Sequence, residues 1–187
     1  MARIRLLQKE DAPPKSRELF DKIEANGASV LNLYRAVAHS PSTIASFVKL
    51  GNVLLNRADL PPKLRELAIL RIATLLGSEY EWAQHLPIAL EAGVTREQAE
   101  SIRQWQDSAD FDDQEQAVLR YTDEVTLNVE AADKTFEALT KYLSERQIVE
   151  LTVSVGYWGM IARVLVPLKI EVEDRSVGST NDLLGKR

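Results

Sequence analysis

Residues 66–85 read Glu-Leu-Ala-Ile-Leu-Arg-Ile-Ala-Thr-Leu-Leu-Gly-Ser-Glu-Tyr-Glu-Trp-Ala-Gln-His, and this stretch decides the fold. Its first half is an apolar run with helical spacing that Glu66 interrupts. The residues three, four and seven positions after Glu66 are Ile69, Leu70 and Ala73, so the pattern turns Glu66 toward the buried side of a helix. A buried carboxylate is costly unless it is paired, hydrogen-bonded or held neutral. Glu66 is therefore the first candidate site residue.

Two more polar residues follow on the next predicted helix. Glu81 and His85 are four residues apart, which places them on one face. Ser78 and Glu81 also form a Ser-x-x-Glu capping-box pattern, which by itself explains both residues structurally. We expect Ser78 to be a helix cap and not a nucleophile, because no Gly-x-Ser-x-Gly turn surrounds it. His85 could equally donate to a nearby carbonyl or form a surface pair with Glu81.

The composition indicates one soluble domain. The chain has 187 residues, a net charge of −5 and no cysteine. We predict a single domain over residues 1–173 and a flexible polar tail over 174–187. The absence of a basic cluster argues against nucleic acid as a partner. No signal peptide is recognisable, so we expect a cytoplasmic protein. The apolar segment 151–162 is bracketed by charges too closely for a membrane span, so we predict no membrane contact.

Helical periodicity covers almost every segment, and no strand pattern is convincing, so the sequence predicts an all-α fold. Ser40 and Pro41 favour a helix that begins with Ser40 as its N-cap. The segments 64–76 and 148–168 are apolar on nearly every side, so both need burial around their whole circumference. The predicted helices cover about 15–25, 30–38, 40–56, 62–77, 79–92, 95–105, 113–128, 133–142 and 145–167.

The spacing of the polar residues resembles a known family. Glu66, Ser78, Glu81 and His85 follow the Glu…Cys-x-x-Cys-x-x-x-His arrangement of alkylhydroperoxidase D-like proteins, with Ser78 and Glu81 at the two cysteine positions. The run 81–95 is similar to the cysteine-free branch related to carboxymuconolactone decarboxylase. The resemblance spans about residues 30–170. It implies an all-α, alkylhydroperoxidase D-like fold with two related helical halves, assembled as a homo-oligomer, a trimer or hexamer.

The resemblance also implies an activity. We expect a cofactor-independent lyase of the carboxy-lyase type that acts on a small carboxylated lactone or a related acid. In this hypothesis His85 is the proton donor or oxyanion partner, Glu66 tunes it or shuttles protons, and Glu81 orients the imidazole. The candidate substrate-binding residues are Arg71, Tyr80 and Trp82. We expect no cofactor. We also expect no metal, although two carboxylates and an imidazole could hold one, because no Glu-x-x-His or His-x-x-x-His spacing occurs.

Several alternatives remain open at this point. Glu66 could pair with Arg65 or Arg71 and serve only the core. The polar cluster could catalyse a different proton-transfer or hydrolytic reaction. The protein could be a non-catalytic helical oligomer that binds a small acid or a protein partner. A dithiol peroxidase cycle is excluded because the chain has no cysteine. Exposure or wide separation of Glu66 and His85 would remove the basis of the enzyme hypothesis.

Overall fold

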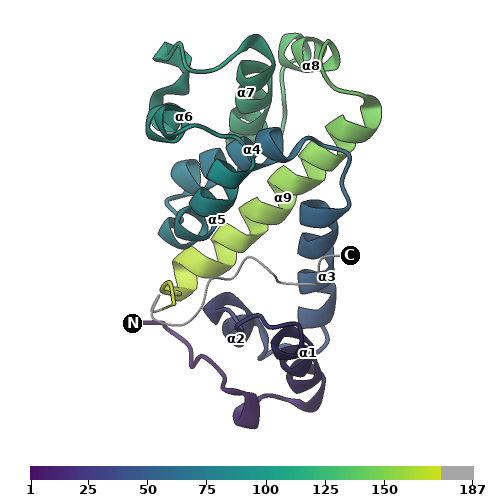
Figure 1. Ribbon diagram of the computed structural model, residues 1–187, viewed down its shortest axis with the longest axis vertical. Helices are drawn as coiled ribbons and strands as arrows, with labels where there is room; N and C mark the ends of the chain where they lie inside the picture. Colours follow the sequence, from purple (N-terminus) through teal and green to yellow (C-terminus); the bar gives the residue numbers. More distant parts are fainter. Residues whose placement is uncertain (174–187) are drawn as a thin grey trace. The chain divides into compact units, whose positions relative to one another are not determined.

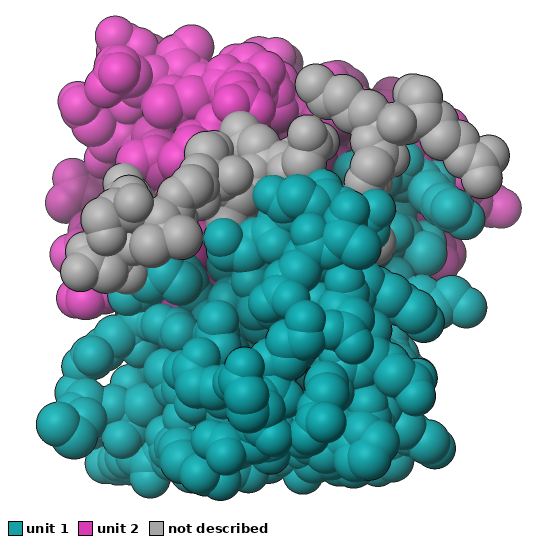
Figure 2. Space-filling view, turned by 60° about the horizontal axis from the view of Figure 1, so that its bottom comes forward, with its two compact units in different colours: residues 1–57, 167–187 teal, residues 58–166 magenta. Residues whose placement is uncertain are grey.

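The computed structural model describes residues 1–173. All regular structure in this part of the chain is helical, without a strand, which confirms the predicted all-α fold (Figure 1). The predicted tail, residues 174–187, lies outside the described residues. The chain divides into two compact units, residues 1–57 with 167–187, and residues 58–166 (Figure 2). The expectation of a single domain stays a prediction.

The first unit contains a short 3-10 helix and three α-helices. These are η1 (Lys9–Asp11), α1 (Pro14–Ala25), α2 (Asn32–Val37) and α3 (Ile44–Asn56). The prediction that Ser40 caps the third α-helix was wrong, since α3 begins at Ile44 with Thr43 as its N-cap. Ser40 instead shares a hydrogen bond between hydroxyls with Thr43, at 2.8 Å. The backbone turn before α3 begins at Ser40, whose carbonyl accepts from the N–H groups of Thr43 and Ile44, each at 3.1 Å.

The second unit contains residues 66–85, which carry Glu66, Glu81 and His85. Its elements are α4 (Pro62–Leu76), α5 (Glu79–Glu91), α6 (Arg96–Ser101), η2 (Ile102–Asp107), α7 (Asp113–Asn128), α8 (Asp133–Thr140) and α9 (Glu145–Leu168), of which the last two residues fall in the first unit. Helix α4 packs against α5, η2 and α7, so it lies at the centre of this unit. One apolar cluster here contains Leu67 and Leu70 of α4, Trp105 of η2 and Leu119 of α7, with Trp82 packed against it.

Helix α4 is buried on every side, as its sequence predicted. Every residue from Leu64 to Ala73 is buried, including Arg65, Glu66 and Arg71. Proline at the first helical position suits its beginning, because proline's fixed φ angle is helical and the missing N–H would have no partner there. Because neighbouring residues surround α4, its polar side chains Arg65, Glu66 and Arg71 face other protein groups and not water.

Helix α9 departs from the same expectation. Four of its apolar residues are 40–61% exposed: Val149, Val153, Met160 and Val166. By length and composition α9 could cross a membrane, but half of its most apolar window is buried within the protein. Core helices of soluble proteins can be equally long and apolar. Because four apolar side chains of α9 are exposed, the prediction that this helix is buried holds for one face only.

Candidate active site

The turn at Gly77 and Ser78 brings two polar helices together. Gly77 ends α4 with φ +66°, a left-handed conformation that glycine adopts without a steric penalty. The N–H groups of Gly77 and Ser78 both donate to the Ala73 carbonyl. Helix α5 begins at once after this turn and packs along α4. As a result Glu66 of α4 and His85 of α5 come into contact.

A chain of hydrogen bonds runs through His85. The Nε–H of Arg65 donates to Glu66 Oε1 at 3.1 Å, and His85 Nδ1 lies 2.8 Å from Glu66 Oε2. On the other side of the ring, Trp158 Nε1 donates to His85 Nε2 at 3.0 Å. Glu66 and Trp158 are 0% and 1% exposed, and His85 is 9% exposed. Glu66 and His85 are thus buried and in contact, as the enzyme hypothesis requires.

The indole decides which nitrogen of His85 carries the proton. An indole N–H can only donate, so Nε2 must be the accepting nitrogen with a free lone pair. The ring is therefore neutral, its proton is on Nδ1, and that N–H donates to the Glu66 carboxylate. The rings of His85 and Trp158 also meet edge to face, with centroids 5.6 Å apart. Both nitrogens are engaged, so His85 offers no free nitrogen to a substrate in this arrangement.

Ser78 and Glu81 differ from the expectation of a capping box. The N-cap Ser78 makes no side-chain cap bond to α5. Both residues are only 2% exposed, and among the described residues neither the Ser78 hydroxyl nor either Glu81 oxygen has a hydrogen-bond partner. The structural explanation of these two residues therefore fails. A buried carboxyl without a partner is rare, because its desolvation is uncompensated.

Burial changes the acidity of Glu81. It raises the pKa of the Glu81 carboxyl to about 7, against a smaller lowering by the Ser78 hydroxyl. The Ser78 hydroxyl lies near enough to act on the carboxyl, although the two do not reach hydrogen-bond geometry. A group with a pKa near neutrality can both give and take a proton under physiological conditions, so it is suited to general acid or base catalysis.

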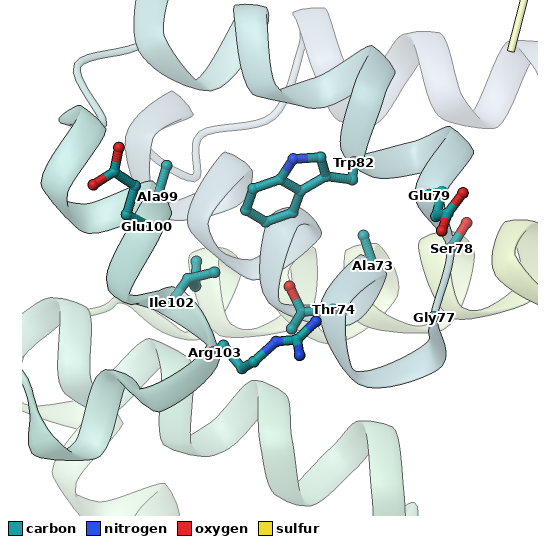
Figure 3. Close-up of a pocket in the computed structure, with 10 residues that line it drawn as sticks. All are labelled: Ala73, Thr74, Gly77, Ser78, Glu79, Trp82, Ala99, Glu100, Ile102 and Arg103. Carbon is teal, nitrogen blue, oxygen red and sulfur yellow. The ribbon is translucent and has the colours of Figure 1, made fainter.

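A surface pocket lies beside Ser78. A cavity of about 430 Å³ is bordered by the Gly77–Ser78 turn, by α4 and α5, and by the region of α6 and η2 (Figure 3). Ser78 lines this pocket, whereas Glu66, Glu81 and His85 do not. Ser78 therefore separates the pocket from the buried carboxyl of Glu81.

The three predicted substrate-binding residues lie in different surroundings. Trp82 lines the pocket, and Tyr80 is buried at 5% exposure. Arg71 makes bonds within the protein: Nε and Nη2 donate to Asp123, at 2.6 and 2.9 Å, and Nη1 donates to the carbonyls of Ile102 and Arg103, each at 3.0 Å. These bonds occupy its guanidinium. The predicted roles of all three residues stay predictions.

Two residues of the site were not identified as such from the sequence. The sequence indicates no role for Trp158 in the site, because its bond to His85 joins residues 73 positions apart, which no local pattern signals. Arg103 lines the pocket but lies in the predicted helix 95–105 among other polar residues, where nothing in the sequence distinguishes it. Within residues 1–173, no group of three or more acidic, histidine or cysteine residues is arranged to hold a metal ion.

Comparison with known proteins agrees with this geometry. Residues 41–124, which include the α4–α5 pair, match the Carboxymuconolactone decarboxylase family. The match covers 84 of the 187 residues, and together with the fold it supports the predicted carboxymuconolactone decarboxylase/alkylhydroperoxidase D-like superfamily. No curated protein matches the chain significantly.

Solved structures share its fold. A protein of unknown function from Agrobacterium tumefaciens is 24% identical, with 74% of this chain and 95% of that chain covered and a TM-score of 0.69. The alkylhydroperoxidase AhpD core of an uncharacterized peroxidase-related protein from Ralstonia eutropha is 17% identical, with 93% of each chain covered and a TM-score of 0.79. A cysteine-to-alanine variant of the debrominase Bmp8, in complex with 2,3,4-tribromopyrrole, is 20% identical, with 92% and 94% covered and a TM-score of 0.75. At these identities the likeness shows the fold alone.

Proposed function

We propose that this carboxymuconolactone decarboxylase-like protein is a cofactor-independent enzyme that decarboxylates a small carboxylated lactone or a related acid. The observation that carries the proposal is Glu81, a buried carboxyl without a hydrogen-bond partner in the described residues, whose pKa burial raises to about 7. Family membership supports the reaction class. The complex of the debrominase supports the idea that a relative of this fold holds a small planar ring.

The reaction needs few groups from the protein. The bond between the carboxylate and its neighbouring carbon breaks, carbon dioxide leaves, and both electrons stay on the carbon, delocalised into the substrate's own carbonyl. The carbonyl oxygen that received the electrons then takes a proton from Glu81 through the Ser78 hydroxyl, which gives the enol of the product, and water restores the proton of Glu81. The low polarity around Glu81 keeps it protonated near neutral pH, which suits a general acid.

In this proposal the roles of Glu81 and His85 are exchanged relative to the sequence hypothesis. His85 was expected to donate the proton, but its Nδ1–H faces Glu66 and its Nε2 accepts from Trp158. We assign it to positioning: the neutral ring, fixed by Glu66 and Trp158, keeps a permanent positive charge away from the neighbouring carboxyl. Glu66 then serves to orient the imidazole, with Arg65 balancing its charge.

The composition of the chain excludes reactions that need a cysteine thiol. The structure of the debrominase in complex with its ligand contains a cysteine-to-alanine variant, and the family resemblance includes dithiol peroxidases. This chain has no cysteine, so neither a thiolate nucleophile nor a dithiol cycle is available to it. We therefore do not propose peroxidase activity.

The test is turnover of a panel of small lactone acids that carry one carboxylate, with γ-carboxymuconolactone, which carries two, for comparison, measured as carbon dioxide release from pH 5 to 9. We expect kcat to fall as pH rises above about 7, because Glu81 loses its proton there. Glu81→Gln should lower kcat by roughly 100-fold or more. Glu97→Gln, which replaces an exposed carboxylate on α6, is the matched control and should leave kcat unchanged. Lack of turnover across the panel, or full activity of Glu81→Gln, contradicts the proposal.

A further inference from the structure

We propose that the pocket beside Ser78 binds a planar acid that carries a single negative charge, with Arg103 as the anchor for its carboxylate. This inference rests on the proposed function, because it names the class of substrate that the proposed enzyme would bind. Its test uses binding alone and therefore does not depend on turnover.

Arg103 is suited to hold a carboxylate. Among the described residues that line the pocket it is the one cation, and its guanidinium extends into the pocket on the side of Thr74 (Figure 3). Its side chain is exposed. Its backbone is fixed, because Arg71 Nη1 donates to the carbonyls of Ile102 and Arg103. Arg71, held in turn by Asp123, thereby positions Arg103 instead of meeting the substrate itself. A guanidinium can grip a carboxylate with two parallel hydrogen bonds.

The wall of the pocket favours a flat molecule. The indole of Trp82 extends across the middle of the pocket, between Ile102 on one side and Ala73 on the other (Figure 3). Trp82 also packs against the apolar cluster of α4, η2 and α7, which restrains its ring. A restrained aromatic face stabilises a planar, conjugated ligand through stacking and loss of apolar surface to water.

Two carboxylates make the pocket selective for charge. Glu79 and Glu100 also line it, and both are exposed. Figure 3 shows them at opposite ends of the pocket, each well apart from the guanidinium of Arg103. A single carboxylate at Arg103 therefore has a cation beside it and no adjacent anion. A second carboxylate at either end would meet a like charge, which opposes binding.

The far end of the pocket leads to the proposed acid. Ser78 lines the pocket, and its buried hydroxyl has no hydrogen-bond partner among the described residues. The same hydroxyl acts on the Glu81 carboxyl. A ligand anchored at Arg103 and lying along Trp82 thus presents its other end to Ser78, which links it to Glu81.

The test is isothermal titration calorimetry at pH 7.5 with three probes that share one conjugated diene: sorbate, muconate and sorbyl alcohol, which carry one, two and no negative charges. We expect sorbate to bind roughly fivefold more tightly than sorbyl alcohol, the size of a favourable ion pair in a partly exposed site. Muconate should bind more weakly than sorbate. Arg103→Gln should remove the preference for sorbate over sorbyl alcohol. The double change Glu79→Gln with Glu100→Gln should strengthen muconate binding.

Two controls separate the pocket from the rest of the surface. Arg96→Gln removes an exposed arginine of α6 that does not line the pocket, and it should leave all three affinities unchanged. Glu97→Gln removes an exposed carboxylate of α6 that does not line the pocket, and it should also leave them unchanged. Equal affinity for sorbate and sorbyl alcohol, an unchanged preference in Arg103→Gln, or tight binding of muconate would overturn the inference. Selective sorbate binding without turnover of any acid would instead remove the proposed function and leave the pocket assignment standing.

Discussion

At the scale of single residues, the ionisation of Glu81 makes the stability of the protein depend on pH. Its pKa rises from 4.5 to about 7, chiefly through burial, so the folded state holds this proton more tightly than the unfolded chain does. Below pH 4.5 both states are protonated and the group costs nothing. As pH rises toward 7 the unfolded chain releases its proton first, and above pH 7 the folded protein bears the full cost of the buried charge, about 3 kcal/mol.

Glu81→Gln should therefore stabilise the protein at high pH. The amide resembles the protonated acid but cannot ionise, so the variant's advantage over the unmodified protein should grow by roughly 2–3 kcal/mol between pH 5 and pH 9. Urea unfolding at both pH values measures this difference. Glu97→Gln, on the exposed surface of α6, should show no such growth. An advantage that is independent of pH would mean that Glu81 has an ordinary pKa.

Trp158 makes a second prediction at this scale. Trp158→Phe keeps an aromatic ring but removes the N–H that donates to His85 Nε2. The proton should then distribute over both ring nitrogens, whereas the unmodified protein should hold it on Nδ1. Nitrogen-15 NMR of the imidazole distinguishes the two tautomers, and the chain has only two histidines to assign. The buried acceptor left without a donor should also cost about 1–3 kcal/mol of stability.

Trp105→Phe is the matched control for this change. Trp105 also loses an indole bond, from Nε1 to Asp123 at 3.0 Å, but it does not touch His85. It should lower stability by a similar amount and leave the His85 tautomer unchanged. A proton on Nε2, or a charged ring, in the unmodified protein at neutral pH would contradict the proposed chain from Trp158 to Glu66.

At the scale of helices, the same Ser/Thr-x-x-Glu/Gln pattern precedes α5 and α6 but forms a capping box only at α6. Thr95 and Gln98 form a capping box at the start of α6, and the ψ angle of Thr95 is 164°. Ser78 has a ψ angle of 83° and caps nothing, although Glu81 stands at the matching position. The reason is the tight Gly77–Ser78 turn between two packed helices, which sets the backbone of Ser78 and leaves its buried hydroxyl without a partner among the described residues.

The end of α7 offers a prediction about stability. Val129 follows this helix with φ +68° and is 88% exposed. A β-branched side chain in this left-handed region costs about 1–2 kcal/mol, and the exposed valine gains little from packing. Val129→Gly should therefore raise the free energy of unfolding by about 1 kcal/mol. Val129→Ala, which keeps Cβ, should gain less. A loss of stability in the glycine variant, by urea unfolding, would show that the valine makes a contact elsewhere.

At the scale of the whole molecule, the apolar residues of α9 bear on assembly. Val149, Val153, Met160 and Val166 remain 40–61% exposed in the single chain, although the sequence of this helix demands burial on nearly every side. Self-association would remove this apolar surface from water and is therefore favourable, and the family resemblance predicts a trimer or hexamer. Light scattering after size-exclusion chromatography should give three or six times the chain mass of 21.0 kDa. A mass of one chain at all concentrations would contradict the predicted assembly.

The sequence by itself determined the helical fold, the burial of Glu66, the Gly77 turn and the absence of thiol chemistry. These depend on periodicity, backbone freedom and composition, which act within a few residues of the chain. The tertiary structure decided the protonated nitrogen of His85, the isolation of Glu81, the internal bonds of Arg71 and the placement of Arg103. Each of these depends on side chains brought together from distant segments, as Trp158 and His85 are across 73 positions, and only packing determines which groups meet.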